Sequence, residues 1–275
     1  GSEMCIRDRY MQSIYFVDSN FTYESSKKSI LSIRYATDGF SFCVHDETEK
    51  LVVFVHEPYA ADSREAAVAR LKNYVVNDAI LNLRFKKVYI MPCFKEKLLV
   101  PGAFFDKANI TTLYTVNQEV SPDDTILYHH IEGIEAYLVE TVISSFHDFV
   151  REHFPVFQIV NGAYPFILGA IGKALRDTEQ IFLDIQDNYF DLLFIRDSGI
   201  QLFNTFSYQA TTDIVYFLLN CIKECGINQE KAHLSICGPA LKDNKLKELL
   251  SLYLPNPYFA KEPLLNGILH DKEFN

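Results

Sequence analysis

The stretch that decides the fold runs from Ser29 to His45 and reads SILSIRYATDGFSFCVH. Apolar and polar residues alternate on both sides of the pair Asp38-Gly39, which is the pattern of two antiparallel strands joined by a tight turn. The apolar run 51–56 completes a predicted three-stranded meander. Ser63 then begins a predicted helix, and residues 87–91 supply a fourth strand.

The same order of elements returns in the second half of the chain. Residues 180–186, 190–196 and 200–208 alternate as three more strands, separated by turns rich in Asp, Asn and Gly. A helix with apolar residues at helical spacing follows and ends at Gly226, and residues 232–237 form the next strand. A β-β-β-α-β order that occurs twice indicates an internal duplication.

The segment between the two copies shows a different pattern. We predict a short strand over 156–160, a helix over about 164–175, and, before them, one amphipathic helix. The residues that define this amphipathic helix are Ile131, Ile134, Leu138, Val142, Phe146 and Phe149. After the second copy, a helix over about 246–254 leads into a tail that prolines interrupt.

These patterns give predicted domain boundaries, with the two halves dividing near Asp177–Gln180. The ranges are an N-terminal extension (1–28), a first unit (29–124), a connecting segment that completes the first lobe (125–178), a second unit (179–258) and a C-terminal tail (259–275).

Composition excludes several classes of protein. The chain has 275 residues, of which 48% are hydrophobic and 23% charged, and this is the profile of a folded globular protein. Its formal net charge of -10 disfavours nucleic acid and anionic lipid as partners. We find no apolar window of roughly 18 residues, so we expect no membrane insertion. The six cysteines form no dense framework and residues 1–12 have no signal-peptide pattern, so we expect a cytoplasmic protein.

The doubled plan, a three-stranded meander followed by helix, strand and helix, resembles the actin, hexokinase and heat-shock ATPase superfamily. The chain is similar in particular to the actin-like proteins of type IV pilus assembly and bacterial cell division, where residues 97–101 match the strand after the first unit. It also resembles a Bacteroidetes family, a domain of unknown function described as having an actin-like ATPase fold. The resemblance implies an α/β fold of two actin-like, ribonuclease H-like lobes.

The resemblance also locates the loops that hold a nucleotide in these ATPases. Their second half begins with a strand that ends in Asp-x-Gly, and here those residues read Asp184-Ile185-Gln186, so Gln replaces Gly. In the first-half loop, Ser32 and Arg34 stand where an Asp and a Gly are expected. Any vestigial nucleotide contacts are therefore expected mainly in the second half, at Asp184, Gln186, Asn188, Gly238 and Pro239.

Chemistry is the weakest signal in the sequence. The 11 glycines are scattered, and no glycine-rich phosphate loop is present. Arg34 places a cation where a magnesium-linked Asp is expected, which argues against phosphoryl transfer. His129-His130 and the helical pair His147 and His153 lack metal-ligand spacing. We therefore expect no catalytic residues, no metal and no cofactor, with ATP and Mg as the alternative.

The sequence leaves three hypotheses for the function of the protein. The leading hypothesis is a non-catalytic actin-like scaffold that binds a protein partner or itself. The alternative is a divergent nucleotide-binding ATPase that uses the cleft between the lobes. The third is a ribonuclease H-like enzyme built on Asp184, Asp187 and Asp191, and strand alternation disfavours it because Asp184 and Asp187 would point to opposite faces.

Overall fold

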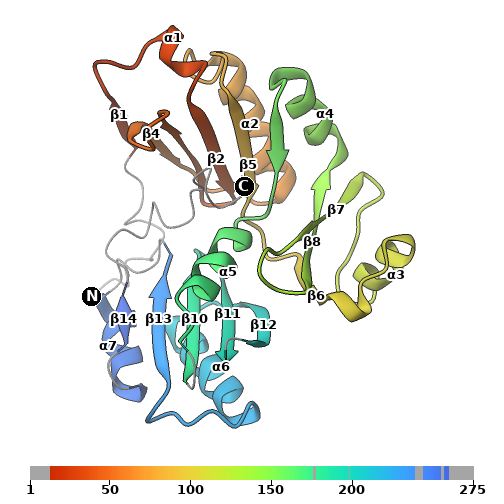
Figure 1. Ribbon diagram of the computed structural model, residues 1–275, viewed down its shortest axis with the longest axis vertical. Helices are drawn as coiled ribbons and strands as arrows, with labels where there is room; N and C mark the ends of the chain where they lie inside the picture. The colour runs from red at the N-terminus through yellow and green to blue at the C-terminus, as the bar shows by residue number, and fades with distance from the viewer. Residues whose placement is uncertain (1–12, 176–177, 198, 239–243, 255–256, 260–275) are drawn as a thin grey trace. The chain divides into compact units, whose positions relative to one another are not determined.

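The computed structural model describes most of the chain, and Figure 1 shows the arrangement of its elements. The described residues are 13–175, 178–197, 199–238, 244–254 and 257–259. They divide into two compact units, which are described separately. The first contains residues 13–130 and 136–164, and the second contains 131–135 and the described residues from Pro165 onward.

The first unit is built on a six-stranded mixed sheet with the order β1-β4-β3-β2-β5-β9. The predicted meander is present as β2, β3 and β4, which pair antiparallel, while β5 runs parallel to β2. The strands are β1 (Ile14–Val17), β2 (Ile30–Ala36), β3 (Gly39–His45), β4 (Leu51–Pro58), β5 (Lys87–Pro92) and β9 (Phe157–Ile159).

Helices α2 (Arg64–Asn77) and α4 (Ser144–His153) share one apolar core with this sheet, and the short helix α1 (Tyr23–Ser26) precedes β2. The Ser63 hydroxyl accepts a hydrogen bond from the Ala66 amide at 3.2 Å and so caps α2, as the sequence predicted. Leu71 of α2 and Phe146 of α4 are both about 1% exposed in this core. Burial of these faces is what fixes the helices to the sheet.

A separate three-stranded antiparallel sheet follows, in the order β6-β8-β7. It comprises β6 (Lys97–Pro101), β7 (Asp124–His130) and β8 (Ala136–Ile143), with α3 (Ile110–Thr115) and the 3-10 turns Gly102–Phe104 and Lys107–Asn109 between β6 and β7. The amphipathic helix predicted from Ile131 to Phe149 is wrong over most of its length, because only the part from Ser144 onward is helical. Six of the eight residues of β8 are buried, so the strand does not show the polar alternation that would reveal it.

The second unit repeats the meander on a five-stranded sheet of order β12-β11-β10-β13-β14. Ile181, Leu183 and Ile185 of β10 enter a core with residues of α6 and α7. The strands are β10 (Glu179–Ile185), β11 (Tyr189–Arg196), β12 (Gly199–Ser207), β13 (His233–Cys237) and β14 (Tyr258–Phe259), and the helices are α5 (Ala163–Gly172), α6 (Thr211–Glu224) and α7 (Asn244–Tyr253). The duplicated α/β plan predicted from the sequence is therefore confirmed (Figure 1).

The compact units change over between Tyr164 and Pro165, before most of α5. The predicted boundary between the duplicated halves, near Asp177–Gln180, stays a prediction. Asp177 itself lies outside the described residues. Among the described helices, none combines the length and the apolar character needed to cross a membrane.

Candidate nucleotide loops

The first-half residues predicted to replace the phosphate loop lie inside a strand. Ser32 and Arg34 belong to β2, where they pair with Cys43 and Ser41 of β3 and are 0% and 8% exposed. The turn between β2 and β3 lies further along the chain and contains Asp38. From the sequence, we had assigned Asp38 only to the turn between the first two strands.

Arg34 nevertheless reaches this turn. One guanidinium nitrogen, Nη1, lies 3.6 Å from Asp38 Oδ1, and the Arg34 side chain is 9% exposed. Opposite charges at this distance and burial attract each other more strongly than on an open surface. The Arg34 cation of β2 is therefore matched by the Asp38 carboxylate of the following turn, and the spacing of four residues between them was the signal that could have revealed the pair.

In the second unit, Asp184 belongs to a polar row that crosses four strands. It pairs with Asp191 of β11 and with Cys237 of β13, and Asp191 in turn pairs with Thr205 of β12. Thr205 Oγ1 donates to Asp191 Oδ1 at 2.6 Å, and Cys237 Sγ lies 3.7 Å from Asp184 Oδ1. Burial, together with the neighbouring Asp184 charge, raises the pKa of the Cys237 thiol well above its usual value. The thiol is therefore a protonated donor.

The turn after Asp184 is tied into its own hairpin. The Gln186 amide donates to the Tyr189 carbonyl at 2.9 Å, and the Gln186 carbonyl accepts from the Tyr208 hydroxyl at 2.5 Å. The carbonyl of exposed Asn188 accepts from the Tyr208 amide at 3.0 Å. A phosphate cradle needs amide groups that point at the ligand, so the Gln186 amide does not serve as one here. Asp187 lies in the same turn, beyond the end of β10.

Gly238 packs directly on the end of β10. Its φ is +106°, and a Cβ built on it would lie 2.3 Å from the Ile185 carbonyl oxygen and 2.8 Å from Asp184 Oδ1. Glycine is needed here because the chain approaches itself closely, a requirement independent of any ligand. The structure thus brings Asp184 and Gly238 together, while Pro239 lies outside the described residues.

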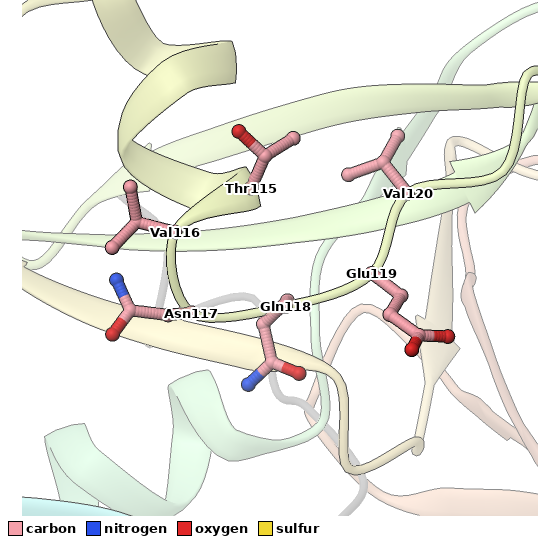
Figure 2. Close-up of a pocket in the computed structure, with 6 residues that line it drawn as sticks. All are labelled: Thr115, Val116, Asn117, Gln118, Glu119 and Val120. Carbon is pink, nitrogen blue, oxygen red and sulfur yellow. The ribbon is translucent and has the colours of Figure 1, made fainter.

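Two hollows of the first unit do not involve these residues. Figure 2 shows the first, which is lined by six consecutive residues, Thr115 to Val120, after α3. The second is lined by Asp18, Asp46 and Lys50 among others, and Lys50 Nζ lies 2.7 Å from Asp18 Oδ2. Within the described part of the chain, no group of three or more His, Cys, Asp or Glu side chains could hold a metal ion.

Solved structures with the same fold share little sequence with this chain. A Bacteroides thetaiotaomicron protein with an actin-like ATPase fold and unknown function is 22% identical, with a TM-score of 0.80 over 88% of this chain and 95% of that one. A PilM-PilN type IV pilus biogenesis complex matches at 12% identity and a TM-score of 0.54, covering 90% of this chain and 92% of that chain. The ethanolamine utilization protein EutJ from Carboxydothermus hydrogenoformans matches at 9% identity and a TM-score of 0.52, covering 91% of this chain and 90% of that chain.

These likenesses show the fold alone, which is the actin-like ATPase fold. No curated protein matches the sequence. The family described as "Protein of unknown function (DUF3822)" matches residues 18–256, and the chain therefore belongs to this family.

Proposed function

We propose that this chain is a non-catalytic actin-like module that acts by binding a protein partner or by self-association. The observation that carries the proposal is the packing around Gly238, because the Ile185 backbone and the Asp184 carboxylate occupy the space beside this residue. The position that resembles an adenosine loop is therefore used for contacts within the unit.

The charge pair of the first unit supports the same function. In a magnesium-dependent ATPase the metal neutralises phosphate charge, and a carboxylate must be available to hold it. Asp38 instead faces the buried Arg34 guanidinium at 3.6 Å. The structurally similar PilM-PilN structure is a complex of two proteins, which supports a protein partner for this chain.

Nucleotide screening and turnover assays test this proposal. We expect the melting temperature of the intact chain to be the same, within about 1 °C, with and without millimolar Mg-ATP, Mg-GTP or Mg-ADP, since a ligand stabilises only the state that it binds. Phosphate release should equal that of the Asp184→Ala variant. A stabilisation of several degrees by one nucleotide, or release that falls in Asp184→Ala, would show that the proposal is wrong.

A divergent nucleotide-binding protein is the second candidate. It is favoured by the direct pairing of Asp184 with Asp191 on neighbouring strands, because two carboxylates side by side attract a cation. This function predicts that Mg²⁺ alone stabilises the protein and that Asp191→Asn removes the effect. Equal melting temperatures with Mg²⁺ and with EDTA would exclude it.

A further inference from the structure

Within the described residues, the chain passes between its two compact units at three places. The crossings follow His130, Glu135 and Tyr164, so the end of β7, the start of β8 and the start of α5 all lie at crossings. Two of these places are joined by a hydrogen bond, because the Tyr164 hydroxyl donates to the His130 carbonyl at 3.2 Å. The residues around them therefore lie where the chain leaves and re-enters the first unit.

A buried carboxyl group holds the start of α5. Glu140 of β8 is 1% exposed, and its Oε2 accepts a hydrogen bond from Asn161 Nδ2 at 3.0 Å. The other end of the same amide, Asn161 Oδ1, accepts from the Ala163 backbone amide at 2.8 Å and so satisfies the first amide of α5, which has no partner within the helix. Glu140 therefore positions the residue that holds the start of the helix.

The second oxygen of this carboxyl group faces a histidine. Glu140 Oε1 and His129 Nε2 lie 3.9 Å apart, and neither atom has a hydrogen-bond partner within the described part of the chain. The distance is too long for a hydrogen bond, and the two atoms would have to approach by about 1 Å to form one. A buried polar atom without a hydrogen-bond partner destabilises the fold. The stability of this part of the structure therefore depends on whether a proton lies between the two atoms.

Other ionisable groups lie near the pair. Lys97 of β6 is opposite Glu140 in register and donates from Nζ to the Phe94 carbonyl at 3.1 Å. Other groups that act on Glu140 or on its neighbours include Arg64 on α2, Tyr35 on β2, Tyr114 on α3, and Cys93 and Glu96 between β5 and β6. The Tyr164 ring of α5 lies edge-on to the His129 ring, with the ring centroids 6.5 Å apart.

Burial sets the protonation of both side chains. It raises the pKa of Glu140 to about 8, which Asn161 and Lys97 only partly oppose, and it lowers the pKa of His129 to about 4. Near neutral pH the carboxyl group thus carries a proton and the imidazole does not. A protonated carboxyl group is a donor and a neutral imidazole nitrogen is an acceptor, so the two suit each other.

We propose that Glu140 and His129 form a proton-controlled lock on the start of α5, which one shared proton closes. A second proton, on His129, or loss of the proton from Glu140 places a charge in this buried cluster. Water must enter to hydrate that charge, and its entry opens the lock and exposes the first turn of α5. The lock requires neither a nucleotide nor a partner, so it stands independently of the proposed function.

The stability of the closed lock depends on pH through both groups, and the two dependences are opposite in sign. The Glu140 pKa is raised on closing, so its stabilisation is lost as pH rises from about 4.5 to 8. The His129 pKa is lowered on closing, so its stabilisation is lost as pH falls from about 6.5 to 4. The two effects nearly cancel near pH 5.5. Between pH 6 and 8 the Glu140 effect dominates, and opening of the lock becomes about tenfold more favourable.

Hydrogen exchange of the Ala163 amide in the intact chain, corrected for the intrinsic rate, tests the lock. We expect its protection to fall about tenfold from pH 6 to pH 8 in the wild type and about 50-fold in His129→Gln, where the opposing group is absent. In Glu140→Gln the trend should reverse, with protection rising about fourfold over the same range. The Ala66 amide is the control, since the Ser63 hydroxyl that caps it does not titrate in this range.

Wild-type protection that is constant within twofold from pH 6 to 8 would overturn the proposal, and so would a Glu140→Gln variant that follows the wild type. A parallel change at Ala66 would show global opening and would also overturn it. If Glu140→Gln does not fold, the proposal is tested instead by the pKa of Glu140 in the wild type, measured from the carbon-13 chemical shift of its carboxyl group as a function of pH. A midpoint near 8 supports the lock, and one near the ordinary value of about 4.5 contradicts it.

Discussion

Gly238→Ala tests whether the chain itself fills the space beside the predicted adenosine loop. The new Cβ would lie 2.3 Å from the Ile185 carbonyl oxygen and 2.6 Å from its amide nitrogen, where backbone atoms must move to make room. A non-glycine residue in a strained backbone region costs about 1–3 kcal/mol, and overpacking adds about 1–3 kcal/mol. We therefore expect the free energy of unfolding to fall by about 2–6 kcal/mol.

Urea unfolding followed by far-ultraviolet circular dichroism measures this loss. Gly226→Ala is the matched control in the same unit, because its φ is also positive, at +61°, but a Cβ there would meet nothing within 4 Å. It carries only the backbone strain, of about 1–2 kcal/mol. If Gly238→Ala costs no more than Gly226→Ala, the space beside Gly238 is not filled by Ile185 and Asp184, and the reasoning is refuted.

Three further substitutions test the packing of the two units by the same unfolding assay. Ser63→Ala should cost about 1 kcal/mol through the lost cap of α2, and Ser63→Asp, which keeps a cap, should cost less. Leu218→Ala, at a position 1% exposed in the core of the second unit, should cost about 2–5 kcal/mol, and a loss below 1 kcal/mol would contradict this core. Arg64→Ala removes the ion-pair partner of Asp124, whose side chain is 2% exposed, and should cost about 3–5 kcal/mol. Removing both charges in Arg64→Ala/Asp124→Ala should cost less than Arg64→Ala alone.

The meanders could be predicted because each consists of strands with a tight turn between them. In β2 and β3 the pair Asp38-Gly39 marks the turn between two alternating runs, and the observed register pairs Ala36 with Gly39 across it. The resemblance to actin-like proteins then followed from the repeated order. The structural likenesses confirm the fold class and the family resemblance.

The three-stranded sheet could not be predicted in the same way. Ile131, Ile134, Leu138 and Val142 happen to be spaced three or four residues apart, which mimics a helix, although the first two lie in the loop before β8. Strand β8 is buried along most of its length, so its apolar residues do not alternate with polar ones. Burial by tertiary contacts removed the periodicity that identifies a strand.

The candidate site was only partly accessible from sequence. Asp184 and Gly238 were singled out, and they lie together in the structure, although a role in nucleotide binding stays a prediction. The Arg34–Asp38 pair depends on where the turn falls, which is beyond the predicted loop residues Ser32 and Arg34. The Glu140–His129 pair joins neighbouring strands of a sheet that was predicted as a helix, so no sequence pattern could indicate it.

Calorimetric titration of the intact chain with Mg-ATP tests the central claim most directly. If the nucleotide positions are used for packing within each unit, the heat of injection will equal that of dilution up to millimolar nucleotide. Saturable heat with a dissociation constant in the micromolar range, about -8 kcal/mol of binding free energy, would contradict the account, and its loss in Asp184→Ala would place the nucleotide at the polar row of the second unit.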